Sequence, residues 1–318
     1  MAIYIILGVA GGLLLLLFLI TLICFLLVFY SPKRRPLGED EYEIPKGEIY
    51  EVYRDDMIRW TREIRSMKRE SFEIKSHDGL TLRGKYYEYS KDAPLEILFH
   101  GYRGNSERDL SGAVHRCFEL GRNALIVDHR ASGESDGHVI TFGILERLDL
   151  LLWVDFAVSH FGEEKKIIIT GISMGAATVM MALSENLPKN VVSALADCGY
   201  TSPKEIIIKV LRDLHLPPWL FYPFIKLGAR IFGRFDLEET SAVKGVSEAN
   251  IPIIFIHGEG DDFVPCSMSE RLYEICSSEH KKLYTVPGVG HGLAYPAAPE
   301  GYYKALREFE EQLQNKAE

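Results

Sequence analysis

The chain has 318 residues, of which 47% are hydrophobic and 25% charged, so it can bury a large core and is not a disordered or low-complexity protein. Acidic residues outnumber basic ones, 45 against 36, and no long block of Lys or Arg is present, which argues against a nucleic-acid partner. The five cysteines show neither paired metal-binding spacing nor a small disulfide framework, so we expect reduced, packed thiols.

The chain begins with an uncharged apolar segment over residues 2–30. Its 29 residues exceed the roughly 20 that a helix needs to cross a bilayer. It lacks the basic start and the small-residue cleavage site of a secretory signal. We therefore expect an uncleaved, single-pass transmembrane anchor over residues 1–30. Lys33, Arg34 and Arg35 follow it, and positive flanks stay in the cytoplasm, which predicts a membrane protein with a cytoplasmic catalytic domain.

A charged, proline-interrupted stretch follows over residues 31–70 and is typical of a linker that leads into a polar helix near 57–68. The remaining residues, 71–318, are predicted to form one globular domain. Its first two segments alternate apolar and polar residues around Asp78-Gly79, the pattern of an antiparallel hairpin.

Short apolar runs then alternate with longer stretches of helical periodicity. The runs lie at 95–100, 123–129, 166–171, 191–198, 251–258 and 281–288. Buried parallel strands with helices on both faces of a sheet produce this alternation. The predicted fold class is therefore α/β, with a mostly parallel central sheet.

One connection is far longer than the others, with about fifty residues between Cys198 and Ile251. It contains two helical patterns split at Pro217-Pro218 and is too apolar for a solvated loop. We interpret it as a helical cap inserted at about 203–250. Four aromatic residues in it are candidates for the wall of an acyl or apolar pocket, or alternatively hold the cap to the body: Trp219, Phe221, Tyr222 and Phe224.

The strand predicted at 166–171 runs into Gly171-Ile172-Ser173-Met174-Gly175, which is followed by a helical segment. A strand, a G-x-S-x-G sequence and a helix in this order indicate a nucleophile elbow, in which small residues flank a serine on a sharp turn. Ser173 is therefore the predicted nucleophile.

A serine hydroxyl needs a neighbouring base, and the base needs an orienting carboxylate. The loop after the strand at 251–258 carries Asp261 and Asp262, and spacing alone does not choose between them. His291 lies between glycines in the loop after the last strand and is the predicted base. The order serine, aspartate, histidine differs from the chymotrypsin and subtilisin orders.

Backbone N–H groups must stabilise the oxyanion that forms on the substrate. The amide of Met174 is one candidate, because it follows the nucleophile. The second candidate is the amide of Tyr102, in the loop that follows the strand at 95–100. Arg103 is a candidate for binding a substrate carboxylate or phosphate, or is a solvated side chain.

Together these motifs resemble the α/β-hydrolase superfamily, in particular its serine hydrolases. The resemblance covers about residues 72–315 and rests on five segments: HGYRGN from His100, DHRASGESDG from Asp128, GISMG from Gly171, HGEGDDFVP from His257 and GVGH from Gly288. It implies that Asp261 rather than Asp262 is the acid. Ala131-Ser132 stands where many relatives carry Gly-His, in a turn without a catalytic role.

The predicted protein is a membrane-anchored serine hydrolase that cleaves carboxylic or acyl esters through a Ser173, His291 and Asp261 triad and an acyl-enzyme. Its expected substrate is a small, lipid-like acyl ester, and its predicted chemistry requires neither a metal nor an organic cofactor. The alternatives are a serine peptidase of the same fold and a non-catalytic, membrane-tethered binding module.

Overall fold

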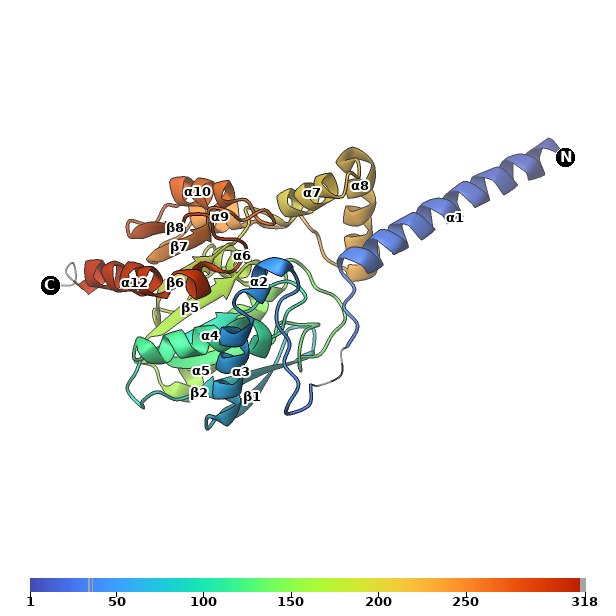
Figure 1. The fold of residues 1–318 in the computed structure, drawn as a ribbon. Coiled ribbons are helices and arrows are strands. Elements are labelled where there is room, and N and C mark those ends of the chain that lie inside the picture. Colours follow the sequence, from blue (N-terminus) through green and yellow to red (C-terminus); the bar gives the residue numbers. More distant parts are fainter. Residues whose placement is uncertain (34, 36, 315–318) are drawn as a thin grey trace.

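The computed structural model describes residues 1–33, 35 and 37–314 (Figure 1). Eight strands form the central sheet of this part of the chain: β1 (Glu70–Lys75), β2 (Thr81–Tyr87), β3 (Leu95–Phe99), β4 (Asn123–Val127), β5 (Ile167–Ile172), β6 (Val191–Asp197), β7 (Ile253–Gly258) and β8 (Lys281–Val286). Their order across the sheet is β1-β2-β4-β3-β5-β6-β7-β8. The α/β prediction is confirmed.

The first two strands form the predicted hairpin. β1 and β2 are antiparallel, with Glu70 opposite Tyr86 and Lys75 opposite Thr81. The Ser76 hydroxyl oxygen stabilises the turn by accepting from the Leu80 amide at 2.8 Å. β2 is also antiparallel to β4, whereas the pairs from β4 through β3 to β8 are all parallel. The carboxyl ends of the parallel strands therefore lie at one edge of the sheet, where ligand sites form in α/β folds.

Helices cover both faces of the sheet (Figure 1). One face is covered by α3 (Arg54–Ser66), α4 (Ser106–Glu119), α11 (Ala294–Ala297) and α12 (Pro299–Gln314). The other is covered by α5 (Glu146–Phe161), α6 (Met174–Ala182), α9 (Ala242–Ser247) and α10 (Cys266–Ile275). β3 is buried at all five positions, which explains its nearly continuous apolar sequence.

The apolar amino-terminal segment forms one helix, α1 (Ala2–Val28), which projects from the body (Figure 1). By length and composition it can cross a membrane. Its carboxyl end packs against the long insertion, which contains α7 (Pro203–Asp213), α8 (Pro218–Gly228) and the π-helix η1 (Ala229–Gly233). The break between α7 and α8 falls at Pro217-Pro218, and Pro218 is the first residue of α8, a position that needs no intrahelical N–H.

The segment between the anchor and the hairpin lies along the body. It contains a short helix, α2 (Glu48–Glu51), and α3, which begins three residues before the polar helix expected at 57–68. The guanidinium of Arg65 donates to the carbonyl of Glu39 at 2.6 Å and pairs with Glu107. These bonds hold the segment against α4.

A buried carboxylate lies in the middle of the sheet, within the apolar strand β3. Glu96 is fully buried and pairs with Arg116 and Arg122, and the Thr170 hydroxyl donates to it at 2.7 Å. Burial opposes ionisation, but the two guanidinium groups and the hydroxyl outweigh it and lower the pKa of Glu96 to about 2. The sheet is thus joined to α4 by a buried ionic cluster.

Replacing Glu96 by alanine is expected to lower the free energy of unfolding by about 3–5 kcal/mol, because two guanidinium groups lose their buried counter-charge. Chemical unfolding of the detergent-solubilised protein, followed by near-UV circular dichroism, measures this loss. Glu73→Ala removes an exposed pair with Arg83 and should cost at most about 1 kcal/mol.

The same carboxylate predicts a pH dependence of stability. The folded pKa of Glu96 lies below the unfolded value of about 4.3, so its contribution is complete above that value and is lost as the pH falls toward 2. A wild-type protein whose stability between pH 5 and 3 changes no more than that of Glu96→Gln would contradict this assignment.

Candidate active site

Ser173 occupies the sharp turn between β5 and α6. Its φ of 56° lies in the left-handed region, which a serine rarely adopts. A Cβ at Gly171 would come within 2.1 Å of the Gly175 backbone, and one at Gly175 within 2.1 Å of the Phe99 carbonyl oxygen. Only glycine fits at these two positions, which is the physical reason for the G-x-S-x-G pattern.

The structure brings Ser173, His291 and Asp261 together, although 118 residues separate the first two. The Ser173 Oγ lies 2.9 Å from His291 Nε2, and His291 Nδ1 lies 2.6 Å from Asp261 Oδ2. A proton on Nδ1 that is donated to the carboxylate leaves Nε2 free to accept the serine proton. This arrangement can generate a serine nucleophile by general-base catalysis.

Asp261 is held in place by several donors. Its Oδ1 accepts from the amides of Phe263 at 2.9 Å and Val264 at 2.8 Å. Its Oδ2 also lies 3.2 Å from Nε2 of His257, whose Nδ1 lies 2.7 Å from the Ser269 hydroxyl. Burial would raise the pKa of Asp261, but hydrogen bonds from His257 and His291 and the backbone outweigh it and hold this pKa well below its ordinary value. The carboxylate is therefore ionised at neutral pH.

Asp262, the competing candidate, is exposed and its carboxylate lies outside this hydrogen-bonded array. Its backbone carbonyl accepts from the Lys209 ammonium of the cap. The two neighbouring aspartates thus have different environments, which the sequence spacing did not reveal.

The loop after β3 lies against the serine. A Cβ at Gly101 would be 3.5 Å from the Ser173 Cβ, and the Gly101 amide donates to the Asp109 carboxylate at 3.2 Å. Met174 begins α6, where the first N–H groups have no partner within the helix. The amide of Tyr102, the next residue of the loop, completes the pair of candidate oxyanion donors.

The side chains of Tyr102 and Arg103 bind the end of the anchor helix. The Tyr102 hydroxyl donates to the carbonyl of Val28 at 2.6 Å. The Arg103 guanidinium donates to the carbonyls of Leu27 at 2.8 Å and Tyr30 at 3.1 Å. These bonds satisfy carbonyls that a helix leaves unpaired at its carboxyl terminus. The Arg103 guanidinium is therefore bonded within the protein, to the end of α1. Sequence patterns did not predict this contact.

Two residues of α2 lie close to the same site. Ile49 approaches Gly290, since a Cβ on that glycine would be 3.1 Å from its Cδ1. Burial is the main cause of the raised pKa of Tyr50, and the nearby Cys198, Asp109 and Asp261 raise it further. The sequence assigned this helix to a linker, and only the tertiary structure places it beside His291.

Cys198 also adjoins the triad. Its sulfur and ligand atoms of Asp261 and His291 all lie within 4.8 Å of one another. Burial raises the pKa of the Cys198 thiol well above its ordinary value, so the group is a neutral thiol. The imidazole and carboxylate are engaged with Ser173 and with backbone amides, and this hydrogen bonding accounts for their positions.

The four aromatic residues proposed for the pocket wall have different surroundings. Phe221, Tyr222 and Phe224 belong to an apolar cluster that also contains Met174 and Tyr102. The Tyr222 hydroxyl donates to Glu238 at 2.7 Å. Trp219, in contrast, is 79% exposed.

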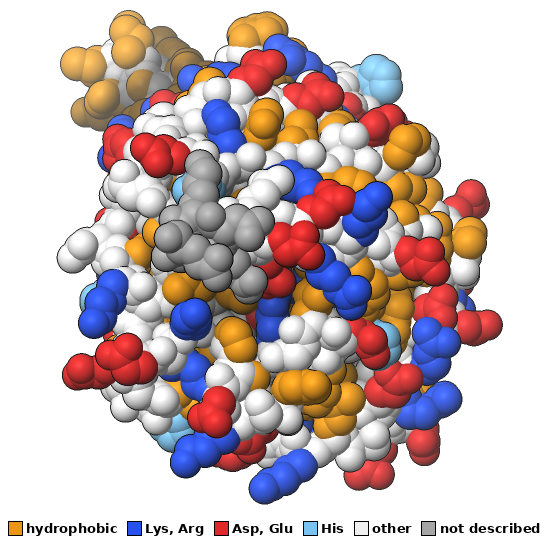
Figure 2. Space-filling view, turned by 90° about the vertical axis from the view of Figure 1, so that its left-hand side faces the viewer, with side chains coloured by type: hydrophobic (Ala, Val, Ile, Leu, Met, Phe, Trp, Pro, Cys, Tyr) orange, Lys and Arg blue, Asp and Glu red, His pale blue; other side chains and the backbone are white. Residues whose placement is uncertain are grey.

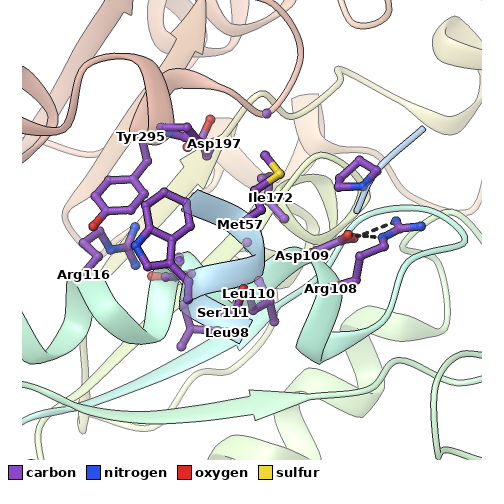
Figure 3. A pocket seen from close by; sticks show the side chains of 18 of the residues that line it. Met57, Leu98, Arg108, Asp109, Leu110, Ser111, Arg116, Ile172, Asp197 and Tyr295 are labelled. Carbon is purple, nitrogen blue, oxygen red and sulfur yellow. Dashed lines mark hydrogen bonds and ion pairs between the residues drawn. The ribbon is translucent and has the colours of Figure 1, made fainter. Parts of the chain in front are cut away.

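A small cavity lies behind the elbow, between the sheet and helices α3 and α4 (Figure 3). Its volume is about 100 Å³. Three buried polar atoms of its lining residues have no hydrogen-bond partner among the described residues: Trp60 Nε1, Arg116 Nε and Asp197 Oδ1. Burial raises the pKa of Asp197, which favours its protonated form.

Comparisons with known proteins agree with the fold. A family model described as alpha/beta hydrolase fold matches residues 97–234. The chain is 30% identical over 254 residues to the uncharacterized protein YqkD of Bacillus subtilis, which covers 79% of this chain and 82% of that protein. It is 24% identical over 198 residues to the uncharacterized membrane protein YNL320W of Saccharomyces cerevisiae, covering 60% and 61% of the two chains.

Among solved structures, the Pyrococcus furiosus esterase Pf2001 aligns with a TM-score of 0.65 and 23% identity, over 86% of this chain and 97% of that one. At this identity the match establishes the fold alone. The eight-stranded sheet and the relative from Bacillus subtilis, which the chain matches over four fifths of that protein's length, support the same family. The chain belongs to the α/β-hydrolase superfamily.

Proposed function

We propose that the protein is a membrane-anchored serine hydrolase that cleaves acyl esters through a covalent acyl-enzyme. The single observation that carries this proposal is the continuous hydrogen-bonded path from the Ser173 hydroxyl through His291 to the Asp261 carboxylate. The esterase that shares the fold over 86% of this chain supports the choice of an ester.

In the proposed reaction, the Ser173 oxygen attacks the substrate carbonyl carbon while His291 Nε2 takes the hydroxyl proton. The amides of Met174 and Tyr102 stabilise the oxyanion. Collapse of the tetrahedral intermediate breaks the ester C–O bond, and the imidazolium protonates the leaving alcohol. Water, activated by the same imidazole, then hydrolyses the acyl-enzyme and restores the serine.

Membrane placement is the second part of the proposal. The 27-residue helix α1 is apolar and mostly exposed, and Lys33 and Arg35 follow it. A relative named as a membrane protein supports this placement. The positive flank supports a cytoplasmic hydrolase body, because basic residues beside a membrane span tend to stay in the cytoplasm. Digestion of sealed inside-out and right-side-out vesicles with an added protease tests this orientation, since only the former should lose the body.

A fluorophosphonate probe should label the full-length protein at Ser173, as identified by peptide mass spectrometry. A panel of p-nitrophenyl esters of increasing chain length, run beside aminoacyl anilides, separates ester from peptide-bond cleavage. Absence of labelling in folded protein would contradict a serine nucleophile. Faster cleavage of the anilides would instead favour a peptidase.

A further inference from the structure

The direction of α1 relative to the hydrolase body is fixed by several contacts. Hydrogen bonds from Tyr102 and Arg103 hold its carboxyl end. At Gly228 the backbone of α8 meets the backbone of α1 closely, because a Cβ there would lie 3.1 Å from the Thr21 carbonyl oxygen. The Phe232 ring of η1 packs 5.6 Å from that of Phe18 and 5.4 Å from that of Phe25. A bilayer around α1 must therefore meet one defined face of the body.

The length of α1 indicates where that bilayer ends. Its 27 residues span about 40 Å at about 1.5 Å per residue, whereas the hydrocarbon layer is about 30 Å thick. The buried residues of α1 are Thr21, Cys24 and Phe25, all in its last third. The hydrocarbon boundary consequently falls near Phe18 and Thr21, beside η1 and the carboxyl end of α8.

At this level the insertion exposes apolar side chains, together with the basic side chains Arg230 and Arg234 of and just after η1. Leu220, Leu227 and Ile231 are 40%, 44% and 53% exposed, and their spacing of seven and four residues places them on one helical face. Trp219 adjoins this face and is 79% exposed. Figure 1 shows α8 beside the base of α1, on the side from which α1 projects. The side of the whole body that points away from α1 carries interspersed acidic and basic side chains (Figure 2).

We propose that this face of α8 and η1, defined by Trp219, Leu220, Leu227 and Ile231, lies in the interfacial layer of the bilayer that holds α1. The occupant of the face is lipid, because its exposed apolar residues continue the exposed apolar surface of α1 at the height where the hydrocarbon ends. Tryptophan is enriched at this depth, where its ring is apolar and its N–H is hydrated.

The consequence concerns the substrate of the proposed hydrolase. The oxyanion loop is bonded to the last turn of α1, and the apolar cluster that contains Met174 and Tyr102 continues into Phe221 and Phe224 of α8. An ester dissolved in the bilayer can therefore reach the cap directly from the lipid, without first passing through water. This step rests on the membrane placement of α1 in the proposed function.

Quenching of tryptophan fluorescence by brominated lipid tests the contact without reference to catalysis. The full-length protein is reconstituted into phosphatidylcholine vesicles with 20% phosphatidylglycerol, with or without bromine at carbons 6 and 7 of the phosphatidylcholine acyl chain. The chain has three tryptophans, and Trp60 and Trp153 are only 7% and 1% exposed. We expect bromine to remove the emission of Trp219, and Trp219→Phe to lose this quenching.

Flotation of the vesicles on a density gradient is measured in the same samples. Protein that floats but is quenched no more than Trp219→Phe would overturn the interfacial contact while leaving the anchor intact. Protein that does not float would overturn both. Disulfide cross-linking between copies of Trp219→Cys, together with no quenching in the wild type, would assign the face to a second copy of the chain and overturn the proposal.

Discussion

Replacing Ser173 or His291 by alanine is expected to lower kcat for p-nitrophenyl ester hydrolysis by roughly 10⁴- to 10⁶-fold, with little change in KM. The reason is that each change removes one end of the 2.9 Å hydrogen bond through which the hydroxyl proton leaves. Steady-state kinetics on the purified full-length protein, corrected for uncatalysed hydrolysis, measures the loss.

The two residues act as a unit, so the double variant should be little slower than either single variant. His280→Ala, which removes a histidine outside the triad, is the matched control and should retain wild-type kcat. Full activity in Ser173→Ala would exclude this nucleophile. A double variant whose loss of kcat equals the product of the two single losses would exclude a shared proton path.

Asp261→Asn is expected to lower kcat about 10⁴-fold, because an amide cannot accept the Nδ1 proton as the carboxylate does and favours the wrong tautomer of His291. Asp262→Asn is the matched control, one residue along the same loop. Its side chain is exposed and outside the array, so its kcat should stay near that of the wild type.

Thermal unfolding of both aspartate variants separates catalytic loss from misfolding. The low folded pKa of Asp261 means that its charge stabilises the wild type above the unfolded value of about 3.9 and that this contribution is lost only as the pH falls below it. Equal kcat values for the two asparagine variants would refute the assignment of Asp261.

His257 lies outside the triad but contacts its carboxylate. Its ring lies between the Asp261 carboxylate and the Ser269 hydroxyl, and its Nε2 also lies 2.8 Å from the Val264 carbonyl oxygen. The ring is therefore bonded at both nitrogens and braces the loop that carries the acid. Its position in the HGxxD segment was visible in the sequence, but its contact with the carboxylate was not.

Local sequence patterns were sufficient for the order of the strands along the chain and for the serine elbow. Burial on both faces makes a parallel strand continuously apolar, and the close approaches at Gly171 and Gly175 exclude any side chain there. Both signals are confined to a few neighbouring residues, so they can be recognised without knowledge of the rest of the chain.

The sequence by itself determined the α/β class, the apolar helix at the amino terminus and Ser173 as the residue of the elbow. Spacing left Asp261 and Asp262 open and only the family resemblance favoured Asp261; the contact of Asp261 with His291 is a feature of the tertiary structure. Tertiary structure alone decided that Arg103 binds the last carbonyls of α1 and that Glu96 lies between two arginines. These contacts join residues that lie 20 to 76 positions apart. Their formation depends on how the sheet and its layers pack, because periodicity and turn chemistry act only over a few residues.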